Sequence, residues 1–291
     1  MNTAAKLSAY GLALALVAGG AWAVGGAVGP LDVNTATPSE MDHQMGDVAE
    51  VVDTRLPGLA VADNGYRLEL RKDQLETGVP AGFGFRIVGV DGKAVTRFDV
   101  QHDRRLHFVV VRRDGSGYQH LHPEMATDGA WSVPLALPAA GSYRVFTDFK
   151  PEGGEKTTLG ADIQVPGQYQ PERYESPTRT DTVDGYEVKL AGELAPGKAS
   201  TVTATVAQNG TPVGDLQPYL GAAGHLVALR ATDLGYLHVH PLDDSTASGP
   251  EIRFAVEVPT PGRYRLFLDF QHAGTVRTAE FTVDTTEETH S

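Results

Sequence analysis

Residues 106–123 read LHFVVVRRDGSGYQHLHP, and residues 224–241 read GHLVALRATDLGYLHVHP. Each stretch contains a histidine, a short apolar run and, thirteen residues after that histidine, a second histidine within Tyr-x-His-x-His-Pro. Six of the chain's ten histidines fall in these two triplets. Similarity between two parts of one chain indicates a repeated structural unit, so we expect two copies of one domain.

The repetition extends beyond these stretches and predicts the fold class. The pattern Pro-x-x-Gly-x-Tyr-Arg-x-Phe-x-Asp-Phe at 138–149 recurs at 259–270, and it resembles the strand of immunoglobulin-like sandwiches whose Tyr anchors a corner. In each copy the apolar runs are short, rich in Val, Phe and Tyr, and separated by turn residues. These features predict an all-β chain with two tandem immunoglobulin-like (cupredoxin-like) β-sandwich domains after an N-terminal transmembrane or signal helix.

The N-terminal region predicts export. No charge occurs between Lys6 and Asp32, and an apolar helix of about twenty residues can cross a bilayer. The tripeptide Ala21-Trp22-Ala23 also offers a small-x-small site for signal peptidase. We therefore expect a single-pass protein of the cell membrane with extracytoplasmic C-terminal domains; the alternative is a protein secreted after cleavage near Ala23.

Composition shifts along the chain predict its domain boundaries. We expect six segments in order: a membrane anchor or signal peptide at 1–29, a flexible acidic stalk at 30–57, a sandwich at 58–166, a linker at 167–177, a second sandwich at 178–285 and a tail at 286–291.

The composition also excludes several function classes. The net charge of −13 argues against nucleic acid as a partner, because phosphate binding needs a basic face. Without cysteine, the chain has no disulfides, thiolate metal sites or cysteine nucleophiles. Nucleophile-elbow, His-Glu-x-x-His and phosphate-loop motifs are missing as well, so we expect a protein that is not an enzyme.

Strand alternation groups the histidines with particular apolar neighbours. Successive side chains of a strand point to opposite faces, so His107 shares a face with Val109 and Val111. We expect this face to point inward and Arg112 to point to solvent. The second copy repeats the pattern from His225.

The triplets suit a metal site, because neutral imidazoles converging from two strands are good ligands for Zn²⁺ or Cu²⁺. A matching Asp in each copy either supplies an oxygen or hydrogen-bonds a ligating imidazole, although alternation argues against Asp148 as a direct ligand. Cu or Zn is the only cofactor expected. The candidate ligands are His107, His120, His122 and Asp148 in the first copy, and His225, His238, His240 and Asp269 in the second.

A structural role for the same histidines stays open. Imidazoles at the edge of a sandwich are often satisfied by backbone carbonyls, tyrosine hydroxyls or each other. The chain is then a structural or interaction module of two sandwiches with an unknown protein partner, and a metal-dependent enzyme is a weaker third option. His102 and His272 have no counterpart in the other copy and are more typical of solvated loops, although each lies near a triplet in sequence.

Several stretches together carry a family resemblance: QHLHPEM at 119–125, LQPYLG at 216–221 and YLHVHP at 236–241. The chain resembles membrane-anchored or secreted actinobacterial proteins in which an apolar segment and a His/Met-containing stalk precede two such repeats. The resemblance implies the two-sandwich architecture and, more loosely, heavy-metal or copper handling. Such relatives often have a longer His-rich stalk, whereas this chain has only MDHQM at 41–45.

Overall fold

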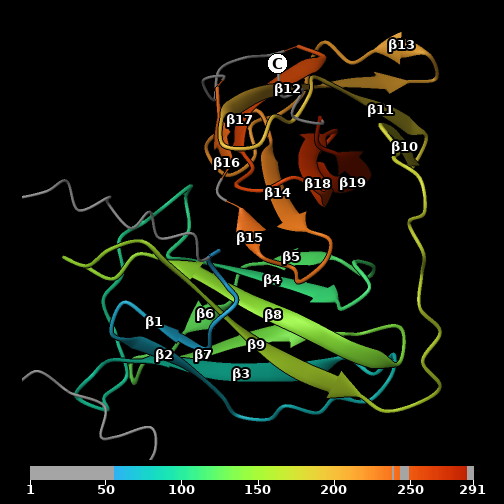
Figure 1. Cartoon of the computed structure of the whole chain (residues 1–291). Coiled ribbons are helices and arrows are strands. Elements are labelled where there is room, and N and C mark those ends of the chain that lie inside the picture. Colours follow the sequence, from blue (N-terminus) through green and yellow to red (C-terminus); the bar gives the residue numbers. More distant parts are fainter. Residues whose placement is uncertain (1–55, 238, 243–248, 287–291) are drawn as a thin grey trace, which may run out of the picture. The chain divides into compact units, whose positions relative to one another are not determined.

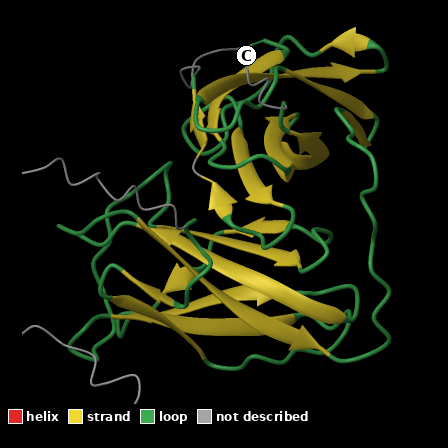
Figure 2. Cartoon of the chain, viewed as in Figure 1, coloured by secondary structure: helices red, strands yellow, loops and turns green. Residues whose placement is uncertain are grey.

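The computed structural model describes residues 56–237, 239–242 and 249–286 (Figure 1). The predicted anchor and nearly all of the predicted stalk lie outside the described residues, as do His238 and most of the predicted tail. Every regular element of the described part is a strand (Figure 2). Within the same residues, no helix has the length and apolar character needed to cross a membrane.

The first repeat folds into two antiparallel sheets. One sheet has the order β1-β2-β3-β7-β6, and the other has the order β5-β4-β8-β9. The strands of the first sheet are β1 (Ala62–Asp63), β2 (Tyr66–Leu70), β3 (Ala81–Val88), β7 (Ala130–Leu135) and β6 (Glu124–Met125). Those of the second are β5 (Gln119–Leu121), β4 (Leu106–Arg112), β8 (Gly141–Phe149) and β9 (Thr157–Val165).

The second repeat has the same plan. Its sheets have the orders β10-β11-β12-β17-β16, with β13 beside β12, and β15-β14-β18-β19. The strands of the first are β10 (Thr180–Val183), β11 (Tyr186–Ala191), β12 (Ala199–Gln208), β17 (Glu251–Glu257), β16 (Val239–Pro241) and β13 (Thr211–Pro212). Those of the second are β15 (Tyr236–Leu237), β14 (His225–Arg230), β18 (Arg263–His272) and β19 (Thr275–Asp284). The predicted fold class of two tandem all-β sandwiches is therefore confirmed.

Each sandwich encloses its own apolar core. Phe108 and Val110 of β4 lie in the first core, and Leu226 and Ala228 of β14 lie in the second. Burying one such large side chain contributes about 1.5–3 kcal/mol, so these two cores supply most of the driving force for folding. The predicted tyrosine corner is present in both copies: the hydroxyl of Tyr143 donates to the Ala139 carbonyl at 2.9 Å, and that of Tyr264 to the Thr260 carbonyl at 2.7 Å.

A third apolar cluster joins the two repeats. It forms because the β4–β8 face of the first repeat that points away from its core meets the equivalent β14–β18 face of the second. The rings of Tyr118 and Phe267 stack across this contact with centroids 4.0 Å apart. The cluster consists of Val109, Val111, Phe146, Val227, Leu229, Leu234, Tyr236 and Phe267, with Tyr118 packed against it.

This contact corrects the predicted direction of the histidine face. His107, Val109 and Val111 do share one face, but that face points out of the sandwich and is covered by the second repeat. Arg112 was expected in solvent and is only 4% exposed. Both faces of β4 are covered, so its side chains have no side open to water. The buried guanidinium of Arg112 instead pairs with the carboxylate of Asp114 at 2.8 Å.

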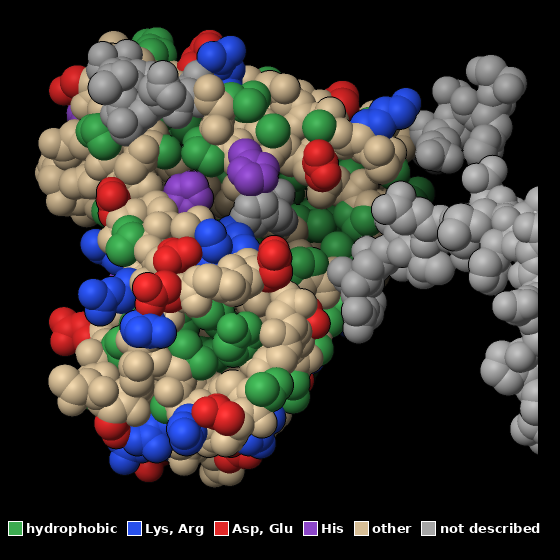
Figure 3. Space-filling model, turned by 90° about the vertical axis from the view of Figure 1, so that its left-hand side faces the viewer, with side chains coloured by type: hydrophobic (Ala, Val, Ile, Leu, Met, Phe, Trp, Pro, Cys, Tyr) green, Lys and Arg blue, Asp and Glu red, His purple; other side chains and the backbone are tan. Residues whose placement is uncertain are grey.

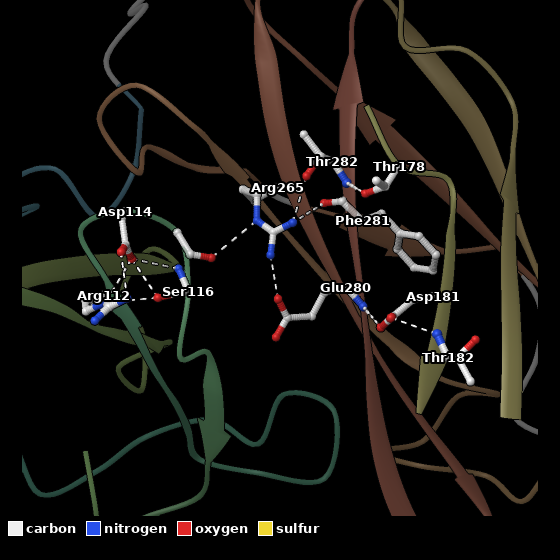
Figure 4. A network of polar contacts seen from close by, with 11 residues as sticks. Arg112, Asp114, Ser116, Thr178, Asp181, Thr182, Arg265, Glu280, Phe281 and Thr282 are labelled. Carbon is white, nitrogen blue, oxygen red and sulfur yellow. Dashed lines mark hydrogen bonds and ion pairs between the residues drawn. The ribbon is translucent and has the colours of Figure 1, made fainter. Parts of the chain in front are cut away.

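Polar contacts also connect the repeats (Figure 4). Arg265 of β18 is buried and donates to the Gly115 carbonyl of the first repeat at 3.3 Å and to Thr282 Oγ1 at 2.8 Å. The matching Arg144 of β8 donates to the Gly58 carbonyl at 2.6 Å. Both buried guanidinium groups are thus satisfied by hydrogen bonds, as a buried charge requires.

The segment just before the first strand binds both repeats. The Tyr236 amide of the second repeat donates to the Pro57 carbonyl at 3.0 Å, and the Gly58 amide donates to the Thr158 carbonyl of the first repeat at 2.9 Å. Gly58 has φ 75°, and a Cβ atom there would lie 2.6 Å from the Phe146 ring. Glycine is required at this position because the segment lies so close to the interface cluster.

Candidate metal centre

Three histidines from different strands meet at the contact between the repeats. His107 is in β4, His120 is in the neighbouring β5, and His225 begins β14 of the second repeat. The register of the sheets places His107 opposite Asp148 and His225 opposite Asp269. Because the two outward faces pack together, the rings of all three histidines come close.

Their spacing approaches that of ligands on one metal ion. One ring nitrogen from each of His107, His120 and His225 lies within 4.8 Å of the others. The ring centroids are 5.2 Å apart for His107 and His120, 5.3 Å for His107 and His225, and 4.6 Å for His120 and His225. Tetrahedral Zn–N bonds of about 2.0–2.1 Å separate ligand nitrogens by about 3.3 Å.

His120 is oriented by a carboxylate of the other repeat. Its Nδ1 lies 2.7 Å from Asp269 Oδ2, and the two side chains are 2% and 3% exposed. The other oxygen of Asp269 accepts a hydrogen bond of 2.6 Å from Thr278. A carboxylate only accepts, so Nδ1 of His120 carries the proton and Nε2 of the neutral ring is a lone pair. This is the arrangement by which a carboxylate orients a metal-binding imidazole.

His107 is oriented by the backbone. Its Nε2 lies 3.0 Å from the Gln101 carbonyl, which can only accept, so Nδ1 of the neutral ring is a lone pair. That Nδ1 lies 3.0 Å from Nε2 of His120. In their neutral forms the two rings therefore aim lone pairs at each other. Either an additional proton or a cation must satisfy them both.

Two more ring nitrogens at this place have no partner among the described residues. Nδ1 of His225 and Nε2 of His122 are both buried without a hydrogen bond. The ring of His122 is 4.8 Å from that of His120 and 5.4 Å from that of His107. Leaving a buried polar atom unsatisfied costs about 1–3 kcal/mol, so these two atoms point to a missing partner.

The electrostatics favour the neutral form of three of the rings. Burial, together with the neighbouring His120, lowers the pKa of His107 to about 4. Burial also lowers the pKa of His122 to about 3 and that of His225 well below its usual value. Neutral imidazole is the form that binds a metal, so at neutral pH these rings need not lose a proton first.

The remaining predicted ligands lie elsewhere or are held differently. Asp148 accepts a hydrogen bond from Thr158 at 2.9 Å and pairs with Lys156 at 3.2 Å. His240 is exposed on β16, and His238 lies outside the described residues. We expected one triplet in each repeat, but the described residues bring His225 together with histidines of the first repeat.

Two groups beside the centre are outside the predicted ligand set. The Gln101 carbonyl is a backbone group and carries no sequence signal. His102 is half-buried, and its ring lies 6.1 Å from that of His107 and 6.0 Å from that of His225. Burial and the nearby Lys156 lower the pKa of His102. Its only signal was its position five residues before His107.

The fold and this cluster define a class: a protein of two tandem β-sandwiches with buried imidazoles at the contact between them. The chain belongs to the family described as "Domain of unknown function (DUF8832)", whose model matches residues 60–167 and 181–287. The family match thus covers both repeats. No curated protein matches the sequence.

Among solved structures, the chain is similar to a mutant alpha-2-macroglobulin of Salmonella at 12% identity and TM-score 0.28, over 81% of this chain and 16% of that one. It is similar to the Escherichia coli adhesin FdeC at 12% identity and TM-score 0.24, over 78% and 66% of the two chains. For the bacterial integrin-binding protein invasin the values are 14% identity and TM-score 0.23, over 77% and 39%. The chain thus spans a small part of the alpha-2-macroglobulin, and these similarities concern the fold alone.

Proposed function

We propose that this chain is an exported, non-enzymatic protein that binds a transition metal, Cu or Zn, at one buried centre made by both repeats. His107, His120 and His225 are the ligands, and Asp269 orients His120. The apolar segment at 1–29 supports a place at the outer side of a membrane.

One observation carries the proposal: His107 Nδ1 and His120 Nε2 lie 3.0 Å apart, while the other nitrogen of each ring is bonded to an acceptor oxygen. A single extra proton, forming an imidazolium beside Asp269, would satisfy that pair and would make the cluster purely structural. It would leave Nδ1 of His225 without a partner, and likewise Nε2 of His122. A metal ion accepts electron pairs from three or four nitrogens at once, so it accounts for more of the cluster than a proton does.

The donor set favours a divalent ion. The gathered ligands are imidazole nitrogens, which suit Zn²⁺ and Cu²⁺, whereas Cu⁺ prefers thioether and thiolate sulfur. The chain has no cysteine, and Met125, which follows His122 closely, packs against the core of the first sandwich. The MDHQM stretch at 41–45 lies outside the described residues.

The test is metal stoichiometry on the purified full chain, stripped with a chelator and titrated with Zn²⁺ or Cu²⁺ by calorimetry and elemental analysis. We expect about one ion per chain, rather than one per repeat, because the ligands come from both repeats. The substitution His120→Ala should abolish this binding. His272→Ala is the matched control, because His272 bonds Tyr186 and Asp215 instead and should leave binding unchanged.

If the intact chain takes up no stoichiometric metal, the proposal fails. The structural alternative then holds, in which the histidines are hydrogen-bonded residues of an interaction module. That alternative predicts that His120→Ala lowers the melting temperature equally with and without added metal.

A further inference from the structure

The centre is closed to solvent at its main ligands. His107 is 2% exposed, and the side chain of His120 is likewise 2% exposed. Nδ1 of His225 is buried as well. A hydrated ion therefore cannot reach these nitrogens without first contacting a side chain at the rim. Histidine side chains do reach the molecular surface on the face drawn in Figure 3.

His102 is a half-buried imidazole directly beside the centre. Its ring is 6.1 Å from that of His107 and 6.0 Å from that of His225. Two rings on one tetrahedral ion have centroids about 5 Å apart, since the bonds are about 2 Å long. In its present position the His102 ring is thus about 1 Å farther from the other two rings than a shared tetrahedral ion allows. His102 is also not one of the three gathered ligands.

A tight turn fixes the position of this side chain. Gln101 and Arg104 exchange two backbone hydrogen bonds of 2.7 and 3.0 Å, and between them His102 and Asp103 have φ 48° and 61°. Positive φ at two consecutive non-glycine residues is uncommon and is held here by the turn. The turn begins at the same Gln101 carbonyl that orients His107.

The second repeat contains the same turn without a histidine. Tyr219 and Ala222 exchange backbone hydrogen bonds of 2.8 and 3.3 Å, and Leu220 and Gly221 have φ 55° and 76°. Leu220, at the place of His102, is 6% exposed. The turn therefore does not need an imidazole to form. An imidazole is present only in the repeat that contributes two of the three ligands.

We propose that His102 is the exchange ligand of the centre: it binds a divalent transition-metal ion arriving from solvent and transfers it to His107 and His225. The inference rests on the proposed function. Each step exchanges one ligand, since the ion loses a water as it binds His102 and loses His102 as it binds the buried nitrogens. A group that speeds transfer in both directions changes the rates and leaves the equilibrium affinity unaltered.

The variant His102→Leu in the full chain tests this, because Leu220 shows that leucine fits the same turn. Zn²⁺ loading and its release to a coloured chelator are followed by stopped flow, and the dissociation constant is measured by competition. We expect both rates to fall about tenfold or more, with the dissociation constant unchanged within about threefold. His102→Asn serves as a second variant, since asparagine tolerates positive φ and lacks the imidazole. His272→Leu is the control and should exchange at the wild-type rate.

Unchanged rates in both His102 variants overturn the inference and leave the proposed function standing. A weaker affinity with faster release and normal loading also overturns it, since His102 would then be a permanent ligand. Failure of the wild-type chain to bind Zn²⁺ is a separate result and overturns the proposed function itself.

Discussion

The two repeats contain the same histidine pattern, but the histidines have different surroundings in each repeat. In the first repeat His107 bonds the Gln101 carbonyl and His120 bonds Asp269 of the other repeat. In the second repeat His225 has a buried Nδ1 without a partner, and His240 is exposed. The two copies are therefore complementary. One repeat supplies most of the imidazoles, and the other supplies one ring and the carboxylate that orients His120.

The largest expected effect on metal affinity is at the histidines of the second repeat. We expect His225→Ala to weaken Zn²⁺ binding by about a hundredfold or more. Loss of a residue that only orients a ligand costs about 10–100-fold in affinity, and loss of a ligand itself costs more. His240→Ala, in the same repeat and exposed, should change the affinity by less than about threefold. Calorimetric titration of the full-length variants measures both. Equal losses in the two variants would mean that each repeat binds through its own triplet.

The matching carboxylates sharpen the comparison further. Asp269→Asn removes the charge that orients His120 and should weaken metal binding by about 10–100-fold. Asp148→Asn, at the equivalent position, should leave the affinity nearly unchanged, because Asp148 is held by Thr158 and Lys156. Competition with a chelator of known affinity compares the two. A larger effect from Asp148→Asn would place the centre in the other half of the contact.

The smallest expected effect is on stability against pH in the metal-free chain. The pKa of His107 is lowered to about 4 by burial, while in the unfolded chain it returns to its ordinary value of about 6.5. Between these values the unfolded chain binds a proton that the folded chain does not. The free energy of unfolding therefore falls as the pH drops from about 6.5 to about 4, and levels off below.

Calorimetric melting in the presence of a chelator measures this fall in stability, and one kcal/mol corresponds to about 2–4 °C for the two sandwiches melting as one unit. The variant His107→Gln should melt with a flatter pH profile than wild type. A wild-type melting temperature that stays constant between pH 6.5 and 4 would contradict the neutral, buried state of His107.

The sequence predicted the fold because repeats and strand alternation are local signals. The period of two correctly grouped His107 with Val109 and Val111 and separated them from Phe108 and Val110. It could not tell which face a second domain covers, so the inward direction and the exposure of Arg112 were wrong. The pair of His120 with Asp269 spans 149 residues and depends on packing between domains, for which one sequence holds no signal.

The placement of the ligands also sets an order of events during synthesis. The chain emerges from its N-terminus, and domains generally fold as they emerge, so the first repeat folds while the second is still being made. His107 and His120 are then in place, but His225 and Asp269 have yet to appear. The Pro57 carbonyl likewise gains its hydrogen bond from the Tyr236 amide only after the second repeat has been made. A chain in which only the first repeat has folded therefore lacks His225 and Asp269, so under the proposed function metal loading has to follow the assembly of both repeats.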